Sequence, residues 1–171
     1  FDRSSPDLTA HALRAWAAWL DDLDPALRFS AEESLQKGIV YLSHSQRSDG
    51  SWLPLWFGNQ FAPNDENPTY GTARVLMALH EPTIRSYPGT PLMRTKGAQW
   101  LLSAQNSDGG WGGAPGTPSS IEETAVAVDA LARLVDESGG DAKQAAVALS
   151  PGALNTVIAK GVAWLIEHTH A

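Results

Sequence analysis

Apolar residues recur along this chain at the three- and four-residue spacing of helices that bury one face. No segment shows the strict alternation of apolar and polar residues that is typical of a half-buried strand. The pattern therefore predicts an all-α protein. The two clearest apolar stripes are Leu8, Leu13, Trp16 and Leu20, and Val126, Leu131, Leu134 and Val135.

Helix starts are marked by residues that can cap the first free N–H groups, followed by a proline or by a glutamate three residues later. The marks are Ser5, Thr90 and Ser150 before a proline, Ser30 and Ser120 in capping boxes, and Thr69 after a proline. A short further helix is expected at 141–148. The main predicted helices are 6–20, 31–45, 70–80, 92–104, 121–137 and 152–168.

A sixteen-residue phrase occurs twice. Residues 37–52 return as residues 96–111, and a third copy begins at Lys160 but stops before its glutamine. Both complete copies follow the pattern Lys-Gly-x-x-x-Leu-x-x-x-Gln-x-x-Asp-Gly-x-Trp. Such repetition indicates one helical unit used several times, each copy burying its apolar face against the next. We expect a single, partial domain over residues 1–171 that ends within a repeat.

The glutamine, glycine and tryptophan of the phrase are expected to build the scaffold rather than to catalyse. Asp-Gly is a strong turn dipeptide because glycine accepts a positive φ. The tryptophan can then lie against the glutamine amide, which satisfies free groups at a helix end. These residues are Gln46, Gly50 and Trp52 in the first copy and Gln105, Gly109 and Trp111 in the second.

The predicted helices alternate in character. The helices of one set contain the Lys-Gly start of the repeated phrase, and the helices of the other set are richer in alanine. Small residues allow close helix approach, so this alternation favours an outer and a crowded inner ring. The outer set is 31–45, 92–104 and 152–168, and the inner set is 6–20, 70–80 and 121–137.

Composition excludes several classes of function. The net charge of −7 and the lack of a basic run argue against nucleic-acid binding. The absence of cysteine excludes disulfides and thiolate chemistry, and the histidines show no ligand-like spacing with carboxylates. We therefore expect neither a metal nor a cofactor. No apolar run is long enough to span a bilayer.

The repeated phrase resembles the QW motif of squalene-hopene and oxidosqualene cyclases. Residues 7–11, Asp-Leu-Thr-Ala-His, resemble the Asp-Val-Thr-Ala-His of the bacterial enzymes. Residues 50–59 with 70–72 resemble their Gly-Ser-Trp-x-x-x-Trp-Gly-x-Asn-Tyr-x-Tyr-Gly-Thr, and residues 117–125 echo a Thr-Pro-Ser-x-Thr-Ala segment. The resemblance implies an α/α toroid in which three inner/outer helix pairs form half of an (α/α)6 barrel.

The resemblance also implies an activity, proton-initiated cyclisation of squalene or a related isoprenoid. In the family the proton comes from an Asp-x-Asp-Asp segment. This sequence lacks that order, since residues 21–24 read Asp-Asp-Leu-Asp and are expected to form a solvated loop. The chain alone is therefore expected to be inactive. The alternative is a non-catalytic toroid that binds an isoprenoid or a partner protein, and the long acidic stretch 60–69 favours such divergence.

Four residues are candidates for the site. Asp7 and His11 share a helix face, and their spacing alone favours an ordinary exposed pair. The resemblance implies instead that His11 hydrogen-bonds the catalytic acid and that Asp7 orients it. Trp56 and Tyr70 resemble aromatics that face the cation in the cavity, the alternative being core packing.

The expected partner is a squalene-like isoprenoid rather than a nucleic acid. Half a barrel would expose an apolar flank, which favours self-association of the chain. The expected location is the cytoplasm or the cytoplasmic face of a membrane, with any membrane contact made through parts outside this chain.

Overall fold

Seven α-helices account for most of the residues that the computed structural model describes, 3–136 and 151–169. Within these ranges the backbone forms no strand, only an isolated bridge between Trp111 and Ser120, so the all-α prediction is confirmed. The predicted helix at 141–148 and the cap at Ser150 lie outside the described residues. The helices are α1 (Pro6–Trp19), α2 (Pro25–Ser45), α3 (Pro68–Leu79), α4 (Pro82–Arg85), α5 (Thr90–Ala104), α6 (Ile121–Asp136) and α7 (Pro151–Thr169).

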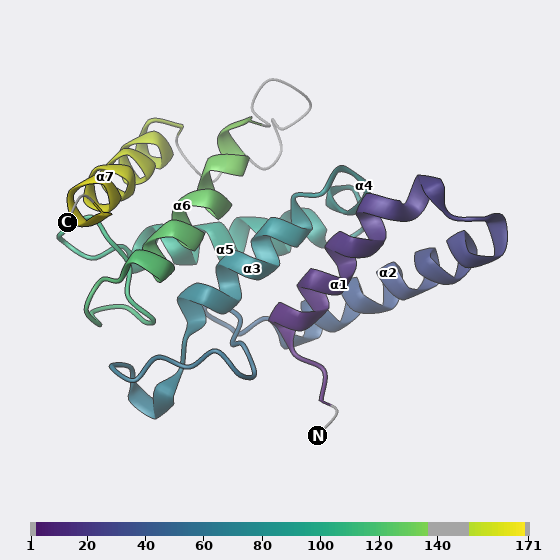
Figure 1. Ribbon diagram of the computed structural model, residues 1–171, viewed down its shortest axis with the longest axis horizontal. Coiled ribbons are helices and arrows are strands. Elements are labelled where there is room, and N and C mark those ends of the chain that lie inside the picture. The colour runs from purple at the N-terminus through teal and green to yellow at the C-terminus, as the bar shows by residue number, and fades with distance from the viewer. Residues whose placement is uncertain (1–2, 137–150, 170–171) are drawn as a thin grey trace.

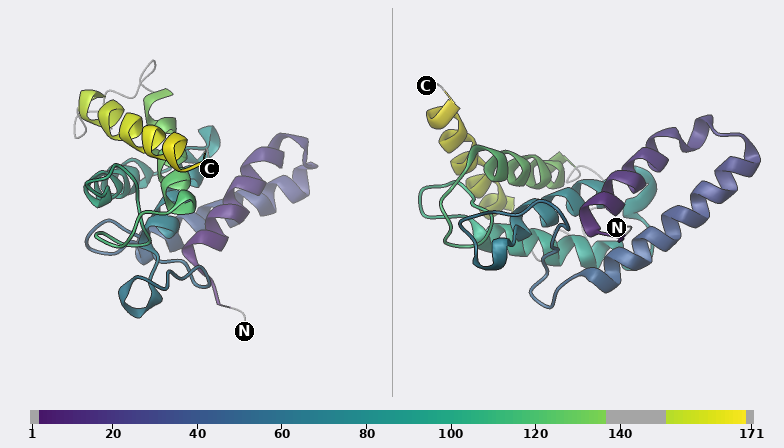
Figure 2. Two further views of the ribbon diagram at one scale, coloured as in Figure 1. Left: turned by 60° about the vertical axis from the view of Figure 1, so that its left-hand side comes forward. Right: turned by 60° about the horizontal axis from the view of Figure 1, so that its bottom comes forward.

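The helices form two layers. In one layer α1, α3 and α6 lie side by side, and α2, α5 and α7 each pack on one of them in the second layer (Figure 1). The pair α1–α2 and the helix α7 lie at opposite ends of this row, as the two further views also show (Figure 2). This is the arrangement of an α/α toroid, with the three inner/outer pairs expected from the alternating composition.

Two predicted caps are present. The Ser5 hydroxyl accepts the Leu8 N–H at 3.4 Å at the start of α1. Before α6, the Ser120 hydroxyl accepts the Glu123 N–H at 3.2 Å and also contacts the Glu123 carboxylate. These interactions satisfy N–H groups that the helix itself cannot pair, which fixes where each helix begins.

The predicted start of the second helix is wrong by six residues. α2 begins at Pro25, and the Asp24 carboxylate accepts the N–H groups of Ala26 and Leu27 at 3.0 Å each. Ser30 is therefore not a cap, because it lies inside the helix and donates its hydroxyl to the Ala26 carbonyl at 3.3 Å. An aspartate followed by proline marks a helix start as clearly as a serine does.

The start of α5 also differs slightly from the prediction. The cap is Gly89, whose φ of 86° lies in the left-handed region, and Thr90 is the first helical residue. Glycine adopts this conformation without steric cost.

The apolar stripe predicted for α1 is partly wrong. Ala10, Leu13 and Leu20 are buried, whereas Leu8 and Trp16 are 49% and 40% exposed. α1 packs against its neighbours through the small Ala10, so its buried face is rotated from the one that the large side chains suggested. The stripe on α6 was predicted correctly: Val126 and Leu131 are buried in the core, and Leu134 and Val135 pack against it.

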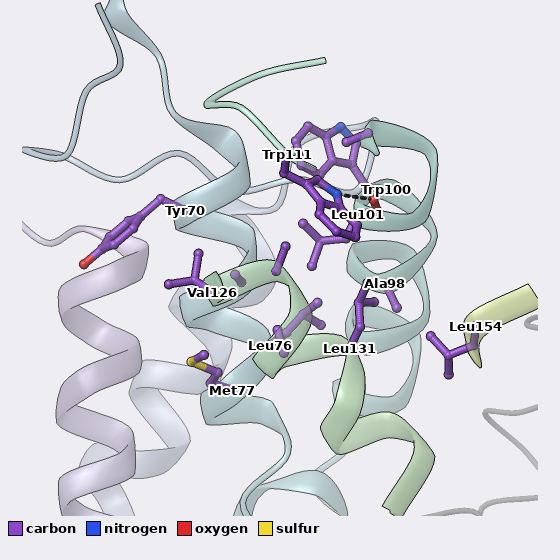
Figure 3. Close-up of a cluster of buried hydrophobic side chains, with 14 residues drawn as sticks. Tyr70, Leu76, Met77, Ala98, Trp100, Leu101, Trp111, Val126, Leu131 and Leu154 are labelled. Carbon is purple, nitrogen blue, oxygen red and sulfur yellow. Dashed lines mark hydrogen bonds between the residues drawn. The ribbon is translucent and has the colours of Figure 1, made fainter. Parts of the chain in front are cut away.

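The core follows α3, which is buried along nearly its whole length. Val75, Ala78 and Leu79 face the cluster shared with α1 and α2, and Leu76 and Met77 face the cluster shared with α5 and α6 (Figure 3). Trp52 belongs to the first cluster and Trp111 to the second, and both are fully buried. Each repeat therefore contributes one tryptophan to one half of the core.

The first repeated loop connects two outer helices. Gln46 Nε2 donates to the carbonyls of Gly50, at 2.9 Å, and of Met93 in α5, at 3.1 Å. The indole N–H of Trp52 donates to the Leu42 carbonyl near the end of α2, at 2.8 Å. The tryptophan thus binds the helix end, a task that the sequence interpretation gave to the glutamine, and the glutamine reaches across to the next outer helix.

The second loop repeats these contacts one unit later. Gln105 Nε2 donates to Gly109 at 2.8 Å and to Val157 in α7 at 2.9 Å. The Trp111 indole donates to the Leu101 carbonyl at 2.9 Å (Figure 3). The two copies of the phrase are therefore equivalent in structure as well as in sequence.

Each tryptophan also contacts the glycine at the second position of the next repeated phrase. A Cβ at Gly97 would lie 2.8 Å from Cζ3 of Trp52, and a Cβ at Gly161 would lie 2.7 Å from Cζ3 of Trp111. Carbon atoms in ordinary contact are 3.5–4.0 Å apart. The Lys-Gly start of the phrase therefore leaves room for the indole of the preceding repeat.

We expect Gly97→Ala to destabilise the protein that carries this chain. Overpacking a buried site costs about 1–3 kcal/mol, which exceeds the roughly 1 kcal/mol that alanine contributes to a helix interior. Thermal denaturation would record a lower Tm. Gly152→Ala is the control, because a Cβ there has no neighbour within 4 Å. Equal Tm values for the two variants would contradict the proposed close contact.

Candidate functional site

Asp7 is buried in the first turn of α1, with 5% of its surface exposed. The Ser5 hydroxyl donates to its Oδ1, so one serine both caps the helix and binds the carboxylate. The helix N-terminus places its partial positive charge beside this carboxylate. Asp7 is thus held in place at the edge of the inner layer.

His11 lies one turn further along α1 and keeps contact with solvent. Within the described part of the chain it makes no hydrogen bond to Asp7, although the resemblance implied that Asp7 orients it. Partial burial of the ring and the positive charges of Arg74 and Arg14 lower the pKa of His11, and the negative charge of Asp7 opposes this shift. Asp7 therefore acts on His11 through the electric field alone.

Tyr70 is 7% exposed in the first turn of α3. It points away from the core tryptophans, on the side of α3 next to α1 (Figure 3). Phe57 stacks on its ring, with centroids 4.1 Å apart and an interplanar angle of 7°. The guanidinium carbon of Arg74 lies 4.8 Å from the ring centroid, a cation–π contact.

Trp56 does not join this aromatic group. Its side chain is 69% exposed, and no stacking with Tyr70 is present among the described side chains. The next residue, Phe57, is the aromatic that stacks on Tyr70. The structure thus brings Tyr70 close to α1 and leaves Trp56 on the surface of the loop.

Sequence reasoning missed two residues of this group, Phe57 and Arg74. Arg74 stands four residues after Tyr70 and therefore shares its helix face, and it is the one charged residue within α3. That charge in an otherwise apolar helix was a usable signal. Phe57 gave none, because its ring position depends on how the loop folds back onto α3.

Hydrogen bonds hold the acidic stretch 60–69 at both of its ends. The Glu123 carboxylate, itself buried, accepts the side-chain N–H groups of Asn59 at 3.1 Å and Asn67 at 2.9 Å. Glu66 pairs with Arg47 at 2.8 Å, and Asp65 is exposed. The loop is therefore docked on α6, and neither of its two acids belongs to the Tyr70 group.

Two of the three acidic residues that follow α1 have structural partners too. Asp24 caps α2, and Asp21 forms an ion pair with Arg28 at 3.2 Å. In residues 3–136 and 151–169 no group of three or more histidines and carboxylates could hold a metal ion. No helix in these ranges has both the length and the apolar character needed to cross a membrane.

Comparison with known proteins agrees with this arrangement. The family model described as "Squalene-hopene cyclase C-terminal domain" matches residues 1–171. A copalyl diphosphate synthase of Streptomyces cyslabdanicus is 32% identical over 92% of this chain and 27% of its own length. A squalene–hopene cyclase of Bradyrhizobium diazoefficiens is 38% identical over 55% of the chain and 14% of its own length. A terpentedienyl-diphosphate synthase of Kitasatospora griseola is 34% identical over 61% of this chain and 19% of its own length.

We expect His11 to titrate below the pKa of a free histidine. Arg74→Gln should raise the pKa of His11, because a nearby positive charge disfavours its protonation, and Asp7→Asn should lower it further. NMR titration of the ring protons would measure both shifts. Arg133→Gln is the control, since Arg133 pairs with Asp129 on α6 and is not among the charges that shift His11. An unchanged titration in Arg74→Gln would contradict the electrostatic account.

Proposed function

The chain belongs to the family of squalene-hopene cyclase C-terminal domains, and we propose that it forms part of the cavity wall of an enzyme that cyclises an isoprenoid by proton transfer. The observation that carries the proposal is that Asp7 and His11 lie on α1 and Tyr70 lies on α3, two inner helices that pack against each other. A histidine that can position a proton-donating acid and an aromatic side chain, contributed by neighbouring inner helices, are groups that such a reaction can use at its start.

His11 would act on an acid that another part of the protein supplies. A carboxylic acid that protonates an alkene must be held in its neutral form and strongly polarised by hydrogen bonds. A neutral imidazole can accept a hydrogen bond on one nitrogen and donate from the other. The lowered pKa of His11 favours that neutral form. His11 would therefore orient the acid and later help to return a proton to it.

Tyr70 and Phe57 would together line the part of the cavity where positive charge develops. Phe57 stacks on Tyr70 and Arg74 lies over the same ring, so the half-exposed Phe57 ring and the edge of Tyr70 are the parts left for a substrate. A carbocation needs electron-rich aromatic faces in a site from which water is excluded, because water would quench it. Tyr70 is buried and is held in place by Phe57 and by the turn that Asn67 caps. A fixed ring offers its charge distribution without reorganisation during the reaction.

The substrate is a hydrocarbon such as squalene or an isoprenoid that carries a diphosphate group. The names of the relatives support both, since they include a squalene–hopene cyclase, a copalyl diphosphate synthase and a terpentedienyl-diphosphate synthase. The chain spans 27% or less of the length of these relatives. We accordingly assign the reaction to the whole protein and expect no turnover by this chain alone, since it lacks Asp-x-Asp-Asp.

A non-catalytic toroid that binds an isoprenoid or a partner protein is the second candidate. Two observations favour it: Asp7 makes no hydrogen bond to His11 within the described residues, and the stretch 60–69 that leads to Tyr70 is long and acidic. Both features depart from the arrangement that the cyclase resemblance implied.

The test is turnover by the protein that carries this chain, incubated with squalene and, separately, with geranylgeranyl diphosphate. Mass spectrometry would identify cyclic products. We expect His11→Ala to lower kcat by about 10²- to 10⁴-fold, the usual contribution of a group that takes part in proton transfer. His44→Ala is the matched control, because His44 is an exposed histidine at the end of α2.

The outcomes separate the two candidates. Cyclic products that depend on His11 but not on His44 support the enzyme. Binding of either isoprenoid without any cyclic product supports the non-catalytic module. Undiminished turnover in His11→Ala would remove His11 from the mechanism.

A further inference from the structure

Glu123 is a buried acid of α6 whose partners differ from those that its place in the sequence predicts. It stands three residues after the capping serine, Ser120, where a glutamate ordinarily accepts the backbone N–H of the cap. In this protein the Ser120 N–H donates instead to the Trp111 carbonyl, at 2.9 Å. The Ser120 hydroxyl donates to Oε2 of Glu123. Oε1 of the carboxylate is therefore available to a segment outside the helix.

Two asparagines, Asn59 and Asn67, occupy that oxygen. Each donates a side-chain N–H to Oε1 of Glu123, at 3.1 Å and 2.9 Å respectively. The side-chain oxygen of Asn59 accepts the Phe61 N–H at 3.0 Å. That of Asn67 accepts the Tyr70 N–H at 3.1 Å and so caps α3. Because both amide oxygens are engaged, both amides present donors to Glu123, and a carboxylate is the acceptor-only group that matches them.

The anchor at Asn59 is built into the packing of the loop. A Cβ at Gly113 would lie 2.4 Å from Cβ of Asn59, so this glycine leaves the room in which Asn59 stands. The Asn59 N–H donates to the Asp65 carbonyl at 3.0 Å. Asn64 and Asp65 have φ values of 58° and 54°. Residues other than glycine rarely adopt this conformation, and it persists only where surrounding contacts impose it. The fold of the loop therefore depends on its anchors.

The two anchors lead to the two rings of the aromatic pair. Phe57 stands two residues before Asn59, and Tyr70 stands three residues after Asn67. The rings stack at 4.1 Å, with Phe57 40% exposed and Tyr70 buried. One carboxylate of α6 thus holds both rings, each through its own asparagine.

We propose that Glu123 is a positioning residue that sets Phe57 on Tyr70 and thereby selects the cyclic product. The proposal rests on the function proposed above, in which these rings line the part of the cavity where positive charge develops. A ring that is held in place stabilises a cation at one position along the substrate.

Displacement of the Phe57 ring would end the reaction earlier along the substrate. A cation that loses a proton gives an alkene, and one that adds water and then releases a proton gives an alcohol. Both outcomes are favoured where water reaches the cation. Glu123 acts on this choice through Asn59 and Asn67 and needs no contact with the substrate.

The first arm of the test measures the stacking by fluorine NMR, on the protein that carries this chain with fluorotyrosine in place of tyrosine. Tyr70→Phe identifies the Tyr70 signal, and Phe57→Leu gives its position without the ring current of Phe57. Glu123→Ala should move the signal most of the way to that position. Glu123→Gln should move it less, because the amide oxygen still accepts both asparagine N–H groups. Glu122→Ala is the matched control, since Glu122 is exposed in the same helical turn, and should leave the signal unchanged.

A further variant keeps the test decisive if Glu123→Ala fails to fold, which thermal denaturation would reveal. Asn59→Ala removes the anchor next to Phe57 and leaves both the Asn67–Glu123 bond and the cap of α3 in place. It should shift the Tyr70 signal in the same direction as Glu123→Ala. A Tyr70 signal that keeps its original position in the folded variants would overturn the proposal.

The second arm measures the ratio of cyclic products formed from squalene and from geranylgeranyl diphosphate, by mass spectrometry. Glu123→Ala should produce a severalfold rise in the share of less cyclised alkenes and alcohols. A role in stability alone would lower the total yield and leave this ratio unchanged. In a Phe57→Leu background, Glu123→Ala should change the ratio no further, because the effects of residues that act through one another do not add.

The two arms separate failure of this proposal from failure of the proposed function. If the unmodified protein forms no cyclic product, the cyclisation is refuted, and the fluorine signals alone decide whether Glu123 holds the ring pair. A displaced Tyr70 signal with an unchanged product ratio would overturn the role of Glu123 in product selection.

Discussion

The close contact between each tryptophan and the glycine of the next outer helix is the constraint on which the rest of the structure depends. Trp52 and Trp111 can be fully buried only because Gly97 and Gly161 carry no side chain. The glutamine of the same loop then reaches a carbonyl of that helix. Two interactions of different kinds, one apolar and one a hydrogen bond, thus set the spacing between successive pairs.

The loops that set the spacing of the outer helices also fix the positions of the inner helices. Each tryptophan also donates its backbone N–H to a threonine of an inner helix, Thr72 at 3.0 Å and Thr124 at 2.9 Å. The loop therefore fixes an outer helix and an inner helix at once. Because α3 is held in this way between α1 and α6, Tyr70 and Arg74 are carried to the side where His11 lies.

The repeated phrase, the caps and the alternation of helix types were enough to predict three helix pairs in two layers. The start of α2 was missed because Asp24 and Pro25 were taken as a loop, although their own chemistry caps a helix. The site was harder to predict, since Asp7 and Tyr70 carry motif signals whereas Phe57 does not. Its stacking depends on a loop whose anchor, Glu123, is 56 residues away from Asn67. Contacts of that kind have no local signature.

The two repeats differ in one respect that bears on how such scaffolds diversify. The backbone bond from the tryptophan to the inner threonine spans 20 residues in the first copy and 13 in the second, yet both bonds have nearly the same length. The same hydrogen bond therefore forms although the number of residues between the tryptophan and the threonine differs. Lengthening a surface loop costs little entropy. Residues 60–66, between the anchors Asn59 and Asn67, are where evolution or an engineer could vary sequence length and surface chemistry while the contacts of Phe57, Asn59 and Asn67 stay the same.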